Sequence, residues 1–60
     1  MTHLPQDPWM LLSVINTKLR DQFPSLTALC EDLDVEAGEL LSVLEKIGYH
    51  YDEGQNAFVP

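Results

Sequence analysis

The residues best suited to bind a metal ion are five carboxylates in the middle of the chain: Glu31, Asp32, Asp34, Glu36 and Glu39. The alternation of Asp32, Asp34 and Glu36 has the spacing of the first ligands in a calcium-binding loop. The match ends there, because such a loop needs a glycine where Ala37 stands and a bidentate glutamate where Val43 stands. We interpret the run as a solvated acidic surface and predict no specific metal site.

Three other residues have side chains that take part in catalysis elsewhere. Cys30 lies among leucines at helical spacing, which favours a buried small hydrophobic residue, and a nucleophilic cysteine would need a base that the sequence does not place beside it. His3 lies in the N-terminal segment and His50 in a predicted strand, and nothing brings the two together. Neither a glycine-rich phosphate loop nor a nucleophile motif is found. We therefore predict that the protein is not an enzyme and uses no cofactor.

The charge of the chain argues against an anionic partner. Lys18, Arg20 and Lys46 face ten carboxylates, which gives a formal net charge of −7. Nucleic-acid-binding proteins gain much of their affinity from lysine and arginine on phosphates. The field of this protein should repel DNA, RNA and anionic membranes, while it keeps a small protein in solution. We expect nucleic acid to be an unlikely partner and a membrane to be none.

Length and composition predict one small domain over residues 1–60. The hydrophobic content of 45% is ordinary for a folded protein and too high for a disordered one. A lone cysteine is compatible with a reducing cytoplasm, and the start of the chain lacks the features of a signal peptide. The longest apolar run, Trp9 to Leu12, is too short to span a membrane. We expect a cytoplasmic protein that depends on helix packing or self-association for stability.

The first predicted helix runs from Pro8 to about Gln22, after a loose arm at residues 1–6. Asp7-Pro8 is a strong start signal, because aspartate caps free amides and proline suits the first helical position. Pro24 ends the helix. The predicted core stripe of this helix consists of Leu12, Ile15, Leu19 and Phe23.

Two more helices and a hairpin are predicted to follow. Ser25 should cap a helix that ends near Leu33, and the next helix should run from about Glu36 to Ile47. Gly48 occupies the position where a left-handed helix cap favours glycine. Residues 49–52 and 57–59 have the pattern of strands around a turn. The predicted fold is therefore mainly α: a three-helix helix-turn-helix core with a short C-terminal β-hairpin, in the order of a winged helix. The predicted inner face of the last helix consists of Leu40, Val43, Leu44 and Ile47.

Two resemblances support this fold. The core positions between residues 25 and 59 look like those of many bacterial winged helices, which concerns fold and hardly function. More specifically, LPQDPWMLLSVINTKLRD at 4–21, PSL at 24–26 and GYHYD at 48–52 resemble a family of very short bacterial proteins, domain of unknown function 4250. The resemblance implies a bacterial source and a small stand-alone protein. It implies no site residues.

The last helix would be the DNA-reading helix of such a fold, yet its composition is unsuitable. Bases are read mainly by arginine, lysine, asparagine and glutamine, with basic neighbours on the phosphates. Acidic residues near its start favour the helix dipole and would oppose phosphates. The predicted outward positions are Glu36, Gly38, Glu39, Ser42, Glu45 and Lys46.

The first helix carries more apolar surface than one core stripe needs, because Trp9, Met10, Leu11 and Val14 widen it. Two interpretations remain open. The hairpin and the N-terminal arm cover Trp9 and Leu11, or Trp9, Met10 and Val14 form an interface, for which tryptophan and methionine are typical.

Asn16 and Arg20 lie one turn apart on this helix, where a mid-helix asparagine is not explained by helix propensity. They could clasp a carboxylate or backbone of a partner. The alternative is a solvated face on which Arg20 or Lys18 pairs with nearby acids.

The function that we predict from these patterns is a protein–protein interaction module that forms a homodimer through its first helix or binds another protein. The alternative is a DNA-binding transcriptional regulator of the winged-helix type. The predicted partner-binding residues are Trp9, Met10, Val14, Asn16 and Arg20.

Overall fold

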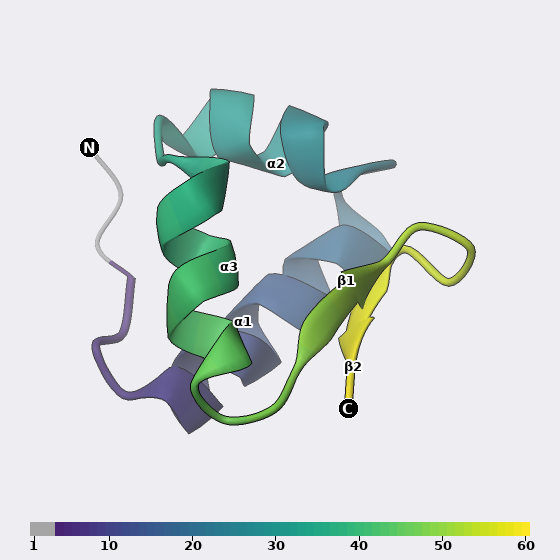
Figure 1. The fold of residues 1–60 in the computed structure, drawn as a ribbon. Helices are drawn as coiled ribbons and strands as arrows, with labels where there is room; N and C mark the ends of the chain where they lie inside the picture. The colour runs from purple at the N-terminus through teal and green to yellow at the C-terminus, as the bar shows by residue number, and fades with distance from the viewer. Residues whose placement is uncertain (1–3) are drawn as a thin grey trace.

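The computed structural model describes residues 4–60, in which three helices are followed by a β-hairpin (Figure 1). The elements are α1 (Pro8–Asp21), α2 (Leu26–Leu33), α3 (Ala37–Glu45), β1 (His50–Asp52) and β2 (Ala57–Val59). The two strands are antiparallel, with Tyr51 opposite Phe58. The predicted order of three helices and a C-terminal hairpin is confirmed. Of the predicted loose arm, residues 1–3 lie outside the described residues, whereas Leu4 packs against the core.

The start of α1 follows the local signal in the sequence. The Asp7 carboxylate accepts a hydrogen bond of 3.1 Å from the Met10 amide, and Pro8 occupies the first turn. This cap satisfies an amide that has no partner inside the helix. The helix ends at Asp21, one residue before the predicted end, because Gln22 is its C-cap.

The second helix is capped as predicted at its start and closes with a left-handed residue at its end. The Ser25 hydroxyl accepts a 3.1 Å hydrogen bond from the Ala28 amide. Asp34 has φ of 57° and lets the Val35 amide bond back to the Cys30 carbonyl at 3.0 Å. Aspartate is one of the few residues other than glycine that adopt this conformation in single turns.

The third helix is shorter than predicted at both ends. Glu36 is its N-cap, and the chain leaves the helix after Glu45 in a tight turn. The Tyr49 amide bonds to the Leu44 carbonyl and the Gly48 amide to the Glu45 carbonyl, each at 3.0 Å. Gly48 has φ of 85°, so the predicted left-handed glycine cap is confirmed.

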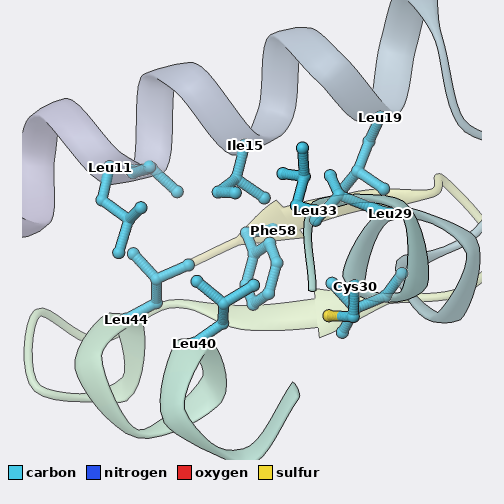
Figure 2. Packing of buried hydrophobic residues seen from close by; sticks show 11 residues of the cluster. Leu11, Ile15, Leu19, Leu29, Cys30, Leu33, Leu40, Leu44 and Phe58 are labelled. Atoms are coloured by element: carbon cyan, nitrogen blue, oxygen red, sulfur yellow. The ribbon is translucent and has the colours of Figure 1, made fainter. Parts of the chain in front are cut away.

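The core brings leucines from all three helices around one aromatic ring of the hairpin (Figure 2). Phe58, 3% exposed, comes from β2 and lies between α1 and α3. Two assignments are corrected: Leu11 belongs to the core at 4% exposure, whereas Phe23 is only half-buried. Leu11 borders a small apolar hollow with Leu4 and Leu40, so the arm and α3 together cover it. The buried residues are Leu11, Leu12, Ile15, Leu19, Leu26, Leu29, Cys30, Leu33, Leu40, Leu44 and Phe58.

The inner face of α3 also differs in part from the prediction. Leu40 and Leu44 are buried, whereas Val43 and Ile47 are half-buried and pack at the edge of the core. Leu40 and Leu44 are therefore the two positions of α3 that reach the centre of the core.

Two glycines offer a matched test of the cap at the end of α3. We expect Gly48→Ala to lower the free energy of unfolding by about 1 kcal/mol, because an L side chain is strained at a positive φ. We expect Gly38→Ala, inside α3, to raise it by up to about 1 kcal/mol through helix propensity. A Cβ at either position would meet no atom within 4 Å, so backbone conformation alone separates the two variants. Urea denaturation measures both, and equal effects of the same sign would contradict this account.

Candidate protein-interaction surface

The first turn of α1 places two large apolar side chains in solvent. Trp9 is 54% exposed and Met10 is 60% exposed, and these are the exposed large hydrophobic residues among residues 4–60. The Asp7 cap fixes the start of the helix and therefore the direction of both side chains. We call Trp9 and Met10 the α1 patch.

Trp9 is held by an aromatic contact with the segment that leads into the hairpin. Its ring meets Tyr49 edge-on, with ring centroids 5.8 Å apart and planes at 86°. This arrangement is favourable because the positive edge of one ring faces the negative face of the other. The hairpin side therefore covers Trp9 in part, and half of the indole remains available to a partner.

The five predicted partner-binding residues do not form one surface. Val14 is half-buried, and Arg20 lies eleven residues beyond Trp9, which is about 16 Å along the helix axis. Only Trp9 and Met10 combine exposure with a large apolar side chain. The prediction of a partner surface therefore rests on the α1 patch, with Arg20 far from it.

Asn16 binds the backbone of its own chain. Its side-chain carbonyl accepts a 2.7 Å hydrogen bond from the Phe58 amide, and its side-chain amide donates one of 3.1 Å to the Phe58 carbonyl. A carboxamide has the same donor and acceptor as a peptide group, so Asn16 pairs with β2 as a neighbouring strand would. This explains why an asparagine stands in the middle of α1. The sequence suggested that Asn16 could bind the backbone of a partner. In the structure, the backbone that it binds belongs to the same chain.

A second polar clasp joins the end of the hairpin turn to the junction of α1 and α2. The Asn56 side-chain amide donates to the carbonyls of Leu19 at 3.0 Å and Phe23 at 2.9 Å. The Tyr51 hydroxyl donates to the Asn56 side-chain carbonyl at 2.6 Å and accepts a 3.3 Å bond from the Leu26 amide. Free backbone groups at the end of one helix and the start of the next are thus satisfied by two side chains of the hairpin.

The roles of Asn56 and Tyr51 were missed by sequence reasoning. Asn56 has φ of 52°, which agrees with the predicted turn, but a turn asparagine gives no sign that its side chain reaches another helix. The Tyr51 ring packs against the core, with its centroid 5.6 Å from that of Phe58. What the pattern could not reveal is the hydroxyl contact with Leu26.

Arg20 pairs with the adjacent acid. Two of its guanidinium nitrogens donate to the Asp21 carboxylate, at 2.9 and 3.1 Å, and both side chains are exposed. This hydrogen bonding lowers the pKa of Asp21 and raises that of Arg20. The alternative interpretation, a solvated face with local pairing, therefore describes Arg20 in the isolated chain.

An open cleft of about 440 Å³ lies between α1 and the hairpin turn, and it is bordered by Asn16, Arg20 and Asn56.

The remaining candidates are placed apart from one another. Cys30 is buried, and burial, followed by the negative charge of Glu36, raises the pKa of its thiol and weakens it as a nucleophile. His50 is exposed on β1, and His3 lies outside the described residues. Within residues 4–60, no three side chains of the metal-binding types are close enough to hold an ion. In the same part of the chain, no helix has the length and apolar character to cross a membrane.

The outward face of α3 carries the side chains expected from the pattern. Its predicted outward positions are all exposed, namely Glu36, Gly38, Glu39, Ser42, Glu45 and Lys46. Three carboxylates on this face would approach phosphates if α3 entered a DNA groove.

The comparison with known families identifies the chain. Residues 5–58 match the family described as Domain of unknown function (DUF4250), and the protein belongs to that family. The resemblance to this family that was inferred from the sequence is confirmed. Comparisons with curated proteins and with solved structures found no match.

The pairing of the Asn16 side chain with the Phe58 backbone can be tested by substitution. We expect Asn16→Ala to lower the free energy of unfolding by about 2 kcal/mol, because the Phe58 amide and carbonyl lose their partner in a partly buried place. Thr17→Ala, the exposed neighbour, should change it by less than about 0.5 kcal/mol. Urea denaturation measures stability, and hydrogen exchange should accelerate at the Phe58 amide in the first variant only. Unchanged exchange there would contradict the clasp.

The two tyrosines of the hairpin region offer a matched pair for the second clasp. We expect Tyr51→Phe to cost about 1–2 kcal/mol, since its hydroxyl joins the Leu26 amide to Asn56. Among the described residues, the Tyr49 hydroxyl makes no hydrogen bond, so Tyr49→Phe should be nearly neutral. Thermal unfolding of the two variants tests the difference, and a loss of stability as large in Tyr49→Phe as in Tyr51→Phe would argue against a specific role of the Tyr51 hydroxyl.

Proposed function

We propose that this protein is a small protein-interaction module that self-associates through the α1 patch. The observation that carries the proposal is the exposure of Trp9 and Met10, at 54% and 60%, side by side on the first turn of α1. A chain of 60 residues has little apolar surface to leave in water, because its core is small. Burial of both side chains against a second copy would remove that surface from solvent.

The chemistry of the patch suits a binding anchor. Tryptophan is among the residues that contribute most to protein interfaces, and methionine adapts its shape to a partner. The edge-on contact with Tyr49 already restricts the Trp9 ring, so less conformational entropy is lost on binding. The patch is therefore partly pre-organised for a protein surface.

The distribution of charge favours α1 over the other surfaces for contact between copies. Two chains with a formal charge of −7 repel one another. Within α1 the charged residues are Lys18, Arg20 and Asp21, so this helix is close to neutral. The segment from α2 to α3 is strongly acidic and contains Glu31, Asp32, Asp34, Glu36, Glu39 and Glu45 without a cation. Contact through α1 keeps the acidic surfaces of two copies apart.

The alternative of a DNA-binding regulator has no specific observation in its favour, since the exposed face of α3 is acidic. We propose a bacterial cytoplasm as the setting, in line with the family resemblance and with Cys30, which is free and buried.

Self-association can be tested with one substitution in the patch. We expect the wild-type protein to dimerise at high micromolar concentration, and Met10→Glu to raise the dissociation constant by about tenfold or more, because a charge would be buried in the interface. Sedimentation equilibrium measures the constant. The fluorescence of Trp9, the one tryptophan of the chain, should shift to shorter wavelength with concentration as its exposed half becomes buried.

The matched control is Ser42→Glu, which adds the same charge to an exposed position of α3. We expect it to weaken association only slightly, through net charge. A wild-type protein that stays monomeric with unshifted fluorescence at all concentrations would refute self-association through α1. Equal weakening by the two substitutions would assign the effect to charge and refute the patch.

A further inference from the structure

The hydrogen bonds of the hairpin show which way each strand directs its backbone groups. In an antiparallel pair, the amide and carbonyl of one residue point to the same side, alternately toward the other strand and away from it. Both groups of Phe58 bond to Asn16, so they point away from β1. Tyr51 stands opposite Phe58, and its amide and carbonyl must therefore point away from β2, to the outer edge of β1.

That outer edge is open. Among residues 4–60, the Tyr51 amide and carbonyl bond to no group outside the hairpin, and their direction keeps them from bonding to β2. The same holds for two neighbouring groups, the Tyr49 carbonyl and the Glu53 amide. The other backbone group of each of these residues already has a partner. The Tyr49 amide donates to the Leu44 carbonyl, and the Glu53 carbonyl accepts from the Asn56 amide. In Figure 2 β2 lies between α1 and β1, and α1 packs against β2, so α1 does not cover this edge.

We propose that β1 pairs with β1 of a second copy, antiparallel and with the two-fold axis at Tyr51. The two Tyr51 residues then exchange two hydrogen bonds, as opposite residues of an antiparallel ladder do. The Glu53 amide of each copy reaches the Tyr49 carbonyl of the other. All four open groups on each edge thereby find a partner, and the two hairpins join into a four-stranded sheet. Open strand edges are known templates for such pairing.

The two neighbouring registers are less favourable, because each needs a backbone group that is already hydrogen-bonded within its own chain. A shift that places Tyr51 opposite Tyr49 needs the Tyr49 amide, which is bonded to Leu44. A shift that places Tyr51 opposite Glu53 needs the Glu53 carbonyl, which is bonded to Asn56. The second shift would also place Asp52 opposite Asp52, and like charges opposite each other are unfavourable. The register centred on Tyr51 instead places His50 opposite Asp52, which keeps like charges from facing each other.

The pairing surface is distinct from the α1 patch and does not rest on the proposed function. It can be isolated by use of the Met10→Glu background, in which the α1 patch is disabled. The two proposals then fail separately, because Met10→Glu leaves every group of the β1 edge in place.

The register can be tested by mixing two single-cysteine variants, His50→Cys and Asp52→Cys. In the proposed pairing these positions face each other with Cα atoms about 4.5 Å apart, inside the range of a disulfide. Two copies of the same variant would place their cysteines diagonally, at about 7–8 Å, outside that range. We expect the mixture to form a mixed disulfide, located by peptide mapping because the buried Cys30 remains. No mixed disulfide, or homodisulfides formed as readily, would overturn the register.

Because Asp52 also accepts bonds from the Gly54 amide and the Gln55 side chain, a second measurement keeps it intact. His50 is exposed and makes no side-chain hydrogen bond among the described residues, so it can be changed without loss of monomer contacts. In the Met10→Glu background, we expect His50→Lys to lower the dimer dissociation constant about two- to fivefold, and His50→Asp to raise it by a similar factor, through Asp52 of the other copy. Ser42→Lys and Ser42→Asp make the same changes in net charge elsewhere. Equal shifts in the controls, or no dimer at any concentration, would overturn the proposal.

Discussion

The pairing of the Asn16 carboxamide with both backbone groups of Phe58 is the interaction on which the arrangement of the whole domain depends. A two-stranded hairpin is marginally stable alone and needs a surface to pack on. Hydrophobic contact would press Phe58 against the helices but would not fix its register, because dispersion and burial have no direction. The two hydrogen bonds add direction. They hold β2 at one position along α1, and Phe58 is then centred among the leucines of three helices.

At the other end of the hairpin, side chains also bond to backbone groups of the helices. Asn56 and Tyr51 satisfy backbone groups where α1 ends and α2 begins, a place where neither helix can do so itself. Polar side chains therefore enclose the apolar core at its margins. None of the buried side-chain polar atoms in residues 4–60 is left without a partner. In so small a domain each unsatisfied group would take a large share of the net stability, so complete pairing is a physical requirement.

These contacts within the chain also limit which parts of the surface are available to partners. The Asn16 side chain on α1 is engaged with the hairpin, and the acidic residues of α2 and α3 disfavour contact between like molecules. What is left is one apolar turn at Trp9 and Met10 and one open strand edge at Tyr51. Both are short, which suits weak and reversible association more than a permanent assembly.

The sequence alone determined the order of the helices and three of the residues that cap them, because the signals involved are local. Asp7-Pro8, Ser25 and Gly48 each act on amides or carbonyls only a few residues away, and each was predicted correctly. It also determined the exposed acidic face of α3, which follows from helical periodicity. The core face of α1 was predicted in the main, since Leu12, Ile15 and Leu19 are buried. Phe23 lies beyond the end of the helix at Asp21, and packing against α3 and Leu4 adds Leu11 to the core.

The partners of Asn16 and Asn56 were decided by tertiary structure alone. They lie 42 and 37 residues away along the chain, and no short-range pattern encodes a contact over that distance. For the same reason the sequence left open whether Asn16 binds a partner, whereas in the folded chain its side chain binds the backbone of Phe58.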